Sequence, residues 1–323
     1  MENRAMVDEE ITVGFDDEAL TIKKLLVRGK KQQQIISIVG MPGLGKTTLA
    51  RKLYNDPYIT HYIHSRGWTY ASQLPRKIDM LLHILRSVNV DEIENMSNEK
   101  LGKKLYKQLK GKRYLIVIDD LWDIGAWVDL KMYFPNDNNG SRVMFTSQLK
   151  EVAMHASPDC HPHCLRFLTE EESWELLQRK VFHNESCPPK MIEIGKQIMK
   201  KCEGLPLVIA IIAGLLAKNI RTQESWKQVA QSVSSYIVSA PKPVLGHTST
   251  ELQSLASPLE TMFSLFRSIS RRPRNPGAKG GLVIVAQKRF DGRIKACRMH
   301  DLLRDLCLKK AREINFLQVD SQL

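Results

Sequence analysis

The sequence contains few cysteines, no long uninterrupted apolar run and no apolar segment at its start. The longest apolar run, residues 205–217, includes a proline and a glycine and is too short to span a bilayer. Residues 1–10 have no apolar core, so we expect no signal peptide. The six cysteines mostly lie far apart and are expected as reduced thiols: Cys160, Cys164, Cys187, Cys202, Cys297 and Cys307. Together these absences favour a cytoplasmic protein without a transmembrane segment.

Acidic residues are in the minority, with 35 Asp and Glu against 48 Lys and Arg and a net charge of +13. A basic balance is compatible with nucleic acid or an acidic membrane as a partner. The excess is scattered over residues 100–113, 271–274 and 288–298. We therefore interpret it as a solvated basic surface and expect no specific nucleic acid. A nucleic-acid-dependent NTPase stays as an alternative, and a steep salt dependence of binding would be its mark.

The central motif occupies residues 35–48, where a buried strand is followed by a glycine-rich turn and the start of a helix. The spacing at 40–47 is G-x-x-x-x-G-K-T, with glycines at Gly40, Gly43 and Gly45. Glycine allows backbone conformations that a Cβ forbids, and it lets a phosphate approach closely. The loop amides and the helix N-terminus offer aligned N–H donors to an anion. Lys46 is expected to reach the β- and γ-phosphates and the Thr47 hydroxyl to ligate Mg²⁺.

A second motif lies at residues 114–122. Four consecutive apolar residues, 115–118, precede Asp119 and Asp120, which indicates a strand buried on both faces of a parallel sheet. Open α/β sheets bind their ligands at the carboxyl ends of such strands. Asp119 is therefore a candidate to hold Mg²⁺, and Asp120 is a candidate to polarise an attacking water. The sequence thus predicts a nucleoside triphosphate or diphosphate site at this end of the sheet.

The first half of the chain alternates expected strands with expected helices. This alternation predicts an α/β fold, the doubly wound parallel sheet of a P-loop NTPase. Expected strands cover residues 35–39, 67–71, 114–118, 141–148 and 164–168, and expected helices include 47–54, 77–88 and 99–109. The Cys-His-Pro-His-Cys segment at 160–164 contains cysteine and histidine, which are common zinc ligands. These residues lie too close together in the sequence to surround one tetrahedral ion, so we interpret the segment as an exposed loop.

Helical patterns replace this alternation from Thr169 onward. Thr169 and Glu172 have the spacing of a capping box, and further helices are expected over 191–202 and 207–217. Later, two strands around Asp-Gly predict a hairpin followed by a helix, which is the remnant of a winged-helix unit. We therefore predict four regions: a nucleotide-binding domain at 1–167, a small helical bundle at 168–238, an irregular region at 239–281 and a partial winged-helix subdomain at 282–323.

The order of these motifs resembles the NB-ARC module of plant nucleotide-binding leucine-rich-repeat immune receptors, in particular the coiled-coil branch. The resemblance covers almost the whole chain. It is carried by Val13-Gly14-Phe15, the phosphate loop, residues 116–122, residues 140–143, Gly204-Leu205-Pro206-Leu207 and Met299-His300-Asp301. It implies a switch controlled by ADP and ATP, with ADP holding the resting state and slow ATP hydrolysis at most. A truncated relative that binds ADP without switching is the alternative within the family.

The resemblance also implies roles for further residues. Val13 and Phe15 would lie beside the adenine or ribose, and Pro206 would pack on the adenine. Thr48 would join the phosphate-binding residues, and His300 would contact the β-phosphate of ADP. A histidine near a phosphate can donate an N–H to it, although His300 is also compatible with a helix cap.

Two departures from the family pattern matter for function. The family arginine that contacts the γ-phosphate is replaced by Gln148, which lacks the cationic fork that arginine offers to phosphate. The stretch between residues 207 and 299 is shorter than is usual for the family. The coiled coil and leucine-rich repeats, the expected partner domains of an immune-receptor oligomer, do not occur in this sequence. A P-loop phosphotransferase is a further alternative, but we identify no base for an acceptor.

Overall fold

The computed structural model describes residues 11–71, 76–90, 93, 96–157, 160–183, 185–218, 222–238, 283–288 and 294–299. The chain divides into two units, Met1–Arg166 and Phe167–Leu323. The first unit contains a parallel sheet, and the described part of the second contains helices and a hairpin.

The first unit is built on a parallel sheet whose strands follow the order β2-β3-β4-β1-β5. The strands are β1 (Gln34–Val39), β2 (Ser65–Tyr70), β3 (Tyr114–Asp119), β4 (Arg142–Ser147) and β5 (His163–Cys164). Every residue of β3 and β4 is buried, as expected for central strands covered on both faces. Because all the strands are parallel, the phosphate loop after β1 and the two acids at the end of β3 lie at the same edge of the sheet.

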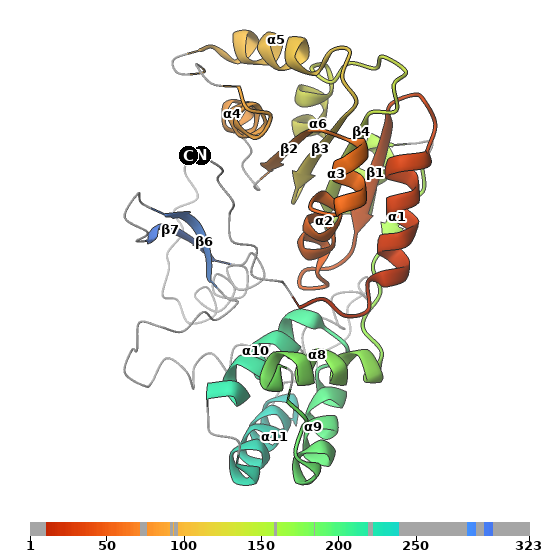
Figure 1. Cartoon of the computed structure of the whole chain (residues 1–323). Coiled ribbons are helices and arrows are strands. Elements are labelled where there is room, and N and C mark those ends of the chain that lie inside the picture. Colours follow the sequence, from red (N-terminus) through yellow and green to blue (C-terminus); the bar gives the residue numbers. More distant parts are fainter. Residues whose placement is uncertain are drawn as a thin grey trace, which may run out of the picture. The chain divides into compact units, whose positions relative to one another are not determined.

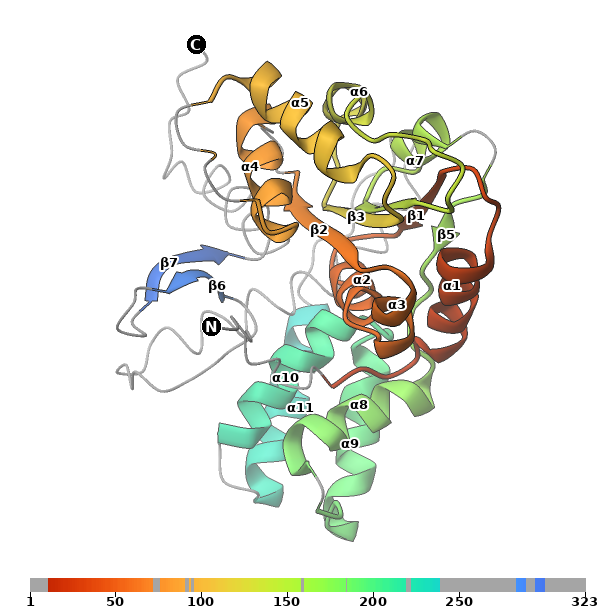
Figure 2. The same cartoon turned by 45° about the horizontal axis from the view of Figure 1, so that its top comes forward.

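Helices cover both faces of this sheet. One layer contains α1 (Asp16–Arg28), α2 (Lys46–Tyr54) and α3 (Pro57–Tyr62), which pack on one another (Figure 1). Figure 2 shows the other layer, which contains α4 (Lys77–Ser87), α5 (Asn98–Leu109), α6 (Ile124–Lys131) and α7 (Lys150–Ala156). The second layer encloses a core of apolar side chains with alternate residues of β3 and β4, including Ile116, Ile118, Val143 and Phe145. The doubly wound α/β prediction is confirmed.

Three short helices were not predicted. The expected helix at 47–54 is followed closely by Pro57, which is the first residue of α3 (Pro57–Tyr62). The Asp56 carboxylate Oδ1 caps that helix by accepting from the amides of Tyr58 (2.9 Å) and Ile59 (3.1 Å). Helices α6 and α7, which follow β3 and β4, span only eight and seven residues. Segments of about two turns carry too few apolar residues to show a helical period.

The fifth strand also differs from the prediction. It was expected at residues 164–168, but β5 contains only His163 and Cys164, paired with Ile38 and Val39 of β1. The segment 160–164, interpreted as an exposed loop, therefore contributes an edge strand of the sheet. Cys164 is exposed and Cys160 is partly buried, in agreement with the surface position expected for this segment.

The second unit contains a helical bundle, as predicted. Its helices are α8 (Glu170–Phe182), α9 (Pro189–Lys201), α10 (Pro206–Lys218) and α11 (Gln223–Val238). The predicted capping box is confirmed, because the Glu172 amide donates to Thr169 Oγ1 (3.2 Å) and the Thr169 amide donates to Glu172 Oε2 (2.8 Å). Packing of α8 on α10 and of α9 on α11 surrounds the fully buried Trp226. This arrangement gives the second unit an apolar core of its own.

The predicted hairpin is confirmed by β6 (Val283–Lys288) and β7 (Ile294–Met299), which pair antiparallel. The expected irregular region at 239–281 and the helix expected after residue 300 lie outside the described residues. The described helices include none that is long and apolar enough to cross a membrane.

Candidate functional site

The turn between β1 and α2 has the backbone of a phosphate-binding loop. Gly43 (φ 85°) and Gly45 (φ 92°) both adopt positive φ values that residues with a Cβ rarely take. Gly45 also directly precedes α2, whose first residue is Lys46. The loop therefore runs into a helix N-terminus, where backbone N–H groups have no partner within the helix and favour an anion.

Lys46 lies over this loop. Its side chain is only 8% exposed, and its Nζ donates to the carbonyls of Gly40 (2.6 Å) and Met41 (3.0 Å). The ammonium group is thus held within the turn rather than extended into solvent. A positive charge in this position complements the phosphates of a nucleotide.

The loop and the acidic strand meet through a hydroxyl and a carboxylate. Thr47 Oγ1 donates to Asp119 Oδ1 at 2.9 Å, although the two residues lie 72 positions apart in the sequence. Hydroxyl and carboxylate oxygens are hard ligands that suit Mg²⁺, which typically takes one or two carboxylates together with the phosphates of its nucleotide. Among the described residues there is no group of three or more His, Cys, Asp or Glu arranged for a metal. The pair Thr47 and Asp119 fits a Mg²⁺ that is also bound by the phosphates of a nucleotide.

Burial raises the pKa of the Asp119 carboxyl above its ordinary value, because the charged form loses its hydration. Hydrogen bonds from Thr146 and Thr47 oppose this shift, as do the positive charges of Arg51 and Lys46. The side chain is only 2% exposed. A divalent cation bound by this carboxylate would offset the cost of burying its charge, so the electrostatics of Asp119 also fit a metal ligand.

Asp120 follows at the end of β3 with a positive φ of 63°. This conformation is uncommon for a residue with a side chain, although aspartate and asparagine adopt it more often than most. The Asp120 amide donates to Thr146 Oγ1 at 2.8 Å, which holds the backbone in this turn. Asp120 therefore lies directly beside Asp119 at the end of the strand, as the sequence predicted.

Val13 and Phe15 lie just before α1, and the ring of Phe15 reaches the phosphate loop. Both side chains are buried, with 7% and 6% exposure. A Cβ added to Gly45 would lie 2.5 Å from Cζ of the Phe15 ring. The structure thus brings the ring of Phe15 to the phosphate loop. Because the side chains of Val13 and Phe15 are buried in the protein, a nucleotide contact would fall to their backbone atoms.

The remaining predicted site residues have more varied positions. Thr48 lies in the first turn of α2, and Gln148 is half-buried directly after β4, at the same edge of the sheet as the acids. Pro206 is the first residue of α10 in the second unit. His300 lies outside the described residues.

Two further residues, Thr146 and Arg51, also act on the acids, although no motif in the sequence singles them out. Thr146 contacts Asp119 and Asp120, and Arg51 lowers the Asp119 pKa through its charge. Arg51 lies four residues after Thr47 on α2, a spacing that places both on one side of the helix. Thr146 lies on a neighbouring strand, so only the strand order could show that it meets the acids.

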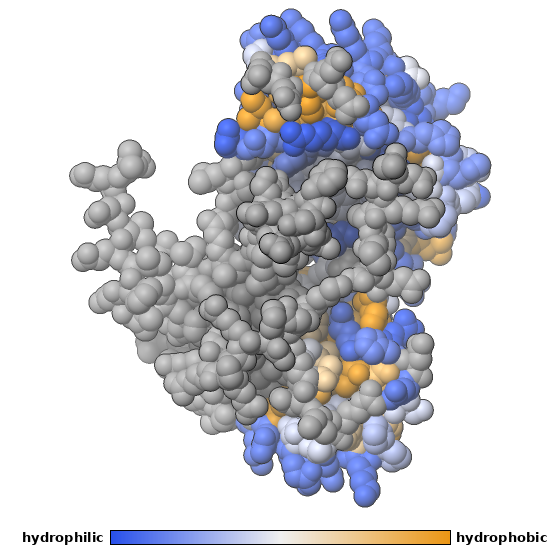
Figure 3. Space-filling model, turned by 60° about the vertical axis from the view of Figure 1, so that its left-hand side comes forward, coloured by the Kyte–Doolittle hydropathy of each residue, from blue (hydrophilic) through white to orange (hydrophobic). Residues whose placement is uncertain are grey.

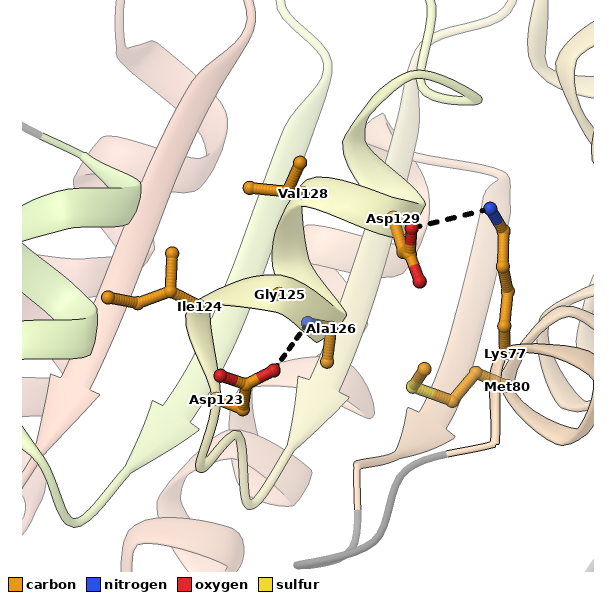
Figure 4. Close-up of a pocket in the computed structure, with 8 residues that line it drawn as sticks. All are labelled: Lys77, Met80, Asp123, Ile124, Gly125, Ala126, Val128 and Asp129. Carbon is orange, nitrogen blue, oxygen red and sulfur yellow. Dashed lines mark hydrogen bonds and ion pairs between the residues drawn. The ribbon is translucent and has the colours of Figure 1, made fainter.

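A hollow of about 400 Å³ lies away from these residues, between α4 and α6. Figure 4 shows the Lys77–Asp129 ion pair (3.5 Å) at this hollow and Asp123 Oδ2, which caps α6 by accepting from the Ala126 amide (3.1 Å). None of the predicted nucleotide-binding residues lines it. We therefore assign this hollow no part in the candidate site.

The strand order, the glycine-rich loop and the acid at the end of β3 define a P-loop nucleotide-binding protein. Residues 15–187 match the family described as the NB-ARC domain. Because this match covers more than half of the sequence, the chain belongs to the NB-ARC family. The family and the loop geometry together imply nucleotide binding.

Curated relatives of the chain are named as plant disease-resistance proteins. A putative late blight resistance protein homolog of Solanum demissum is 39% identical over 322 residues, which cover 96% of this chain and 41% of that protein. The disease resistance protein RPP13 of Arabidopsis thaliana is 34% identical over 356 residues, which cover 98% of this chain and 42% of that protein. A second late blight resistance protein homolog from Solanum demissum is 37% identical over 341 residues, which cover 96% of this chain but only 26% of that protein. The chain thus spans between about a quarter and two fifths of these relatives.

Two solved structures share the fold at low sequence identity. The ORC2 protein of Aeropyrum pernix, solved as ADPNP-ADP complexes, has a TM-score of 0.54 and 11% identity, with 94% of this chain and 98% of that chain covered. Cdc6p from Pyrobaculum aerophilum has a TM-score of 0.50 and 14% identity, with 92% of this chain and 93% of that chain covered. These likenesses support the P-loop architecture of the chain.

Proposed function

We propose that this chain is the ADP- and ATP-binding switch module of a plant intracellular immune receptor, with ADP bound in the resting state. The observation that carries the proposal is the contact between Thr47 and Asp119, which joins the phosphate loop to the acidic strand at one site. This arrangement supports binding of a nucleotide with Mg²⁺, held by Thr47 and Asp119. The disease-resistance names of the relatives support a role in plant defence.

We further propose that the chain hydrolyses ATP slowly at most, and that Asp120 polarises the attacking water. The proposal also includes a cytoplasmic location and the nucleotide contacts of Val13, Phe15, Thr48, Pro206 and His300. Coiled-coil and leucine-rich-repeat domains of the same receptor are the proposed partners, and an oligomer of receptors is the proposed active form. We also propose that the four regions of the chain meet at residues 167, 238 and 281.

The test is the identity and amount of nucleotide released when the purified chain is denatured. We expect close to one ADP per chain, detected by chromatography of the released nucleotide. Sustained ATP hydrolysis at metabolic rates would contradict a switch and favour a phosphotransferase. A chain that carries no nucleotide and does not bind added ADP would refute the proposed site.

A truncated relative that binds ADP without switching is the second candidate. Gln148 favours it, because a neutral amide cannot give the γ-phosphate the bidentate cationic contact of an arginine. The affinities for ADP and for a non-hydrolysable ATP analogue separate the two candidates. A switch requires measurable binding of both nucleotides, whereas the non-switching relative binds only ADP.

A further inference from the structure

The ladder between β3 and β4 ends immediately before the two acids. Its register pairs Leu115 with Arg142 and continues to Ile118 with Phe145. The next residue of β4 is Thr146, and the chain continues from Ile118 with Asp119, the last residue of β3, and then Asp120. The regular pairing of β3 with β4 therefore stops where the functional side chains begin.

Thr146 replaces the strand pairing at this point with three contacts. Its Oγ1 donates to Asp119 Oδ1 at 2.6 Å and accepts from the Asp120 amide at 2.8 Å. Its carbonyl accepts from the Leu121 amide at 2.8 Å. One residue of β4 thus holds three consecutive residues at the end of β3. The Thr146 side chain is only 1% exposed, so these contacts are protected from water.

The directions of these hydrogen bonds follow from the atoms involved. A threonine hydroxyl has one hydrogen, and the Asp120 amide can only donate, so the Thr146 hydroxyl must give its hydrogen to Asp119. Thr47 Oγ1 donates to the same carboxylate oxygen at 2.9 Å. Two donors on one oxygen fix the rotation of the Asp119 carboxylate about its Cβ–Cγ bond.

Of these two donors, only Thr146 lies outside the phosphate loop. Thr47 belongs to the loop and would itself contact the metal in the proposed site, so its position depends on the nucleotide. Thr146 is anchored in a central strand between β3 and β1. Its contact with Asp119 is therefore in place before a nucleotide or a metal arrives.

We propose that Thr146 is a positioning residue for Mg²⁺. Its hydroxyl holds the carboxylate of Asp119 in the orientation that binds the metal, and it also fixes the left-handed backbone of Asp120. Thr146 therefore determines the metal-dependent part of nucleotide affinity, while the loop and Lys46 determine the metal-independent part. This inference rests on the proposed function of the site.

The test compares Thr146→Val, which keeps the shape of the side chain and removes the hydroxyl, with Thr146→Ser, which keeps the hydroxyl. The matched control is Ser147→Ala, which removes a hydrogen bond from Ser147 Oγ to the Leu121 carbonyl (2.6 Å) in the same turn without touching either acid. Binding of ADP and of a non-hydrolysable ATP analogue is measured by titration calorimetry, once with excess Mg²⁺ and once with EDTA. The readout, for each nucleotide, is the ratio of its affinity with Mg²⁺ to its affinity in EDTA.

We expect Thr146→Val to reduce the gain in affinity from Mg²⁺ by about 10–100-fold, as is usual when a group that orients a metal ligand is removed. The affinity in EDTA should stay close to that of the wild type, which a merely structural role would not predict. Thr146→Ser and Ser147→Ala should keep the gain. If Thr146→Val does not fold, Thr146→Cys keeps the side-chain size with only a weak donor and acceptor and takes its place.

Three outcomes would overturn the inference. The first is an unchanged Mg²⁺ effect in Thr146→Val, and the second is an equal loss of affinity with and without Mg²⁺. In both cases the wild type binds nucleotide, so the proposed function stands while the role of Thr146 is refuted. The third is a wild-type chain that binds neither nucleotide, which refutes the proposed function together with this inference.

Discussion

The ring of Phe15 covers the face of Gly45 where a side chain would stand. A Cβ at Gly45 would lie 2.5 Å from the ring atom Cζ, which is too short for unbonded carbon atoms, and 3.1 Å from Cε2, which is a tight contact. Gly45 also has a φ of 92°. Two separate constraints therefore restrict this loop position to glycine. One is its own left-handed backbone, and the other is the ring of Phe15, which lies about 30 positions earlier in the sequence.

Gly45→Ala should both destabilise the chain and abolish nucleotide binding. A left-handed conformation costs a residue with a Cβ about 1–2 kcal/mol, and the overlap with Phe15 adds to that cost. Gly111→Ala is the matched control, because Gly111 has a φ of 76° but no heavy atom within 4 Å of an added Cβ. Chemical denaturation should show a larger loss for Gly45→Ala than for Gly111→Ala. If Phe15→Ala does not reduce the cost of Gly45→Ala in the double variant, the overlap is not its cause.

Lys46→Ala and Lys46→Arg should both lose the nucleotide that purifies with the chain. Alanine removes the charge over the loop, and the planar guanidinium of arginine does not reproduce the contacts of the ammonium group with the Gly40 and Met41 carbonyls. Lys52→Ala is the control on the same helix, because Lys52 makes a largely exposed ion pair with Asp16 (2.8 Å). Normal ADP content in the Lys46 variants would contradict the site assignment.

Asp119→Asn should stabilise the nucleotide-free chain at neutral pH and remove the effect of Mg²⁺ on binding. Burial raises the Asp119 pKa in the folded chain above its unfolded value, so the folded state binds the proton more tightly. The unfavourable contribution of Asp119 is therefore absent below its unfolded pKa and grows as the pH rises through its folded pKa. Asparagine carries no charge and avoids this cost.

The gain in stability of Asp119→Asn should accordingly be absent below the unfolded pKa of about 4 and increase as the pH rises from there, until Asp119 is ionised in the folded chain as well. Denaturant titrations in EDTA at several pH values measure it. Asp129→Asn is the control, since Asp129 forms a surface ion pair with Lys77 at 3.5 Å and should show little change. A pH-independent difference between Asp119→Asn and the wild type would show that the carboxyl titrates normally in the folded chain.

Gln148→Arg should strengthen ATP binding relative to ADP binding. A charge-assisted hydrogen bond to the γ-phosphate would change the ratio of the two affinities by about tenfold or more. Leu149→Arg places the same charge on the adjacent residue, whose side chain is 44% exposed, and should leave the ratio unchanged. An equal ratio in Gln148→Arg and the wild type would show that position 148 does not contact the γ-phosphate in this chain.

Arg142→Gln should destabilise the first unit by about 3 kcal/mol or more, because it leaves several partly buried carbonyls without donors. The Arg142 side chain is fully buried and donates to the carbonyls of Leu25 (3.0 Å), Gln32 (3.2 Å) and Lys30 (2.9 Å). Burial, together with the charge of Arg113, lowers its pKa to about 10, so the guanidinium stays charged at neutral pH. Arg76→Gln removes only an exposed ion pair with Asp79 (3.4 Å) and serves as the control. Equal denaturation midpoints for the two variants would contradict this role of Arg142.

Figure 3 shows that the described side chains on one face are mostly hydrophilic, with small and separate apolar areas. The exposed lysines of α5, such as Lys103 and Lys107, belong to the scattered basic excess seen in the sequence.

The sequence alone determined the phosphate loop, the acidic strand and the class of fold. Each of these is a local pattern in which the spacing of glycines, a lysine and acids, or the length of an apolar run, sets the backbone and its burial. The capping box at Thr169 and Glu172 and the hairpin of β6 and β7 were predictable for the same reason. Short helices such as α3 and α7, and the two-residue strand β5, lack enough residues to show a period.

Only the tertiary structure decided which distant residues complete the site. Thr146 meets Asp119 because β4 lies between β1 and β3, and nothing in the residues around Thr146 indicates that strand order. The packing of Phe15 on Gly45 likewise depends on the path of the chain from α1 to the loop. Local patterns determine what a segment can do, whereas long-range packing determines which side chains meet. For this reason the sequence located the loop and the acids, and the fold added the residues that hold them in place.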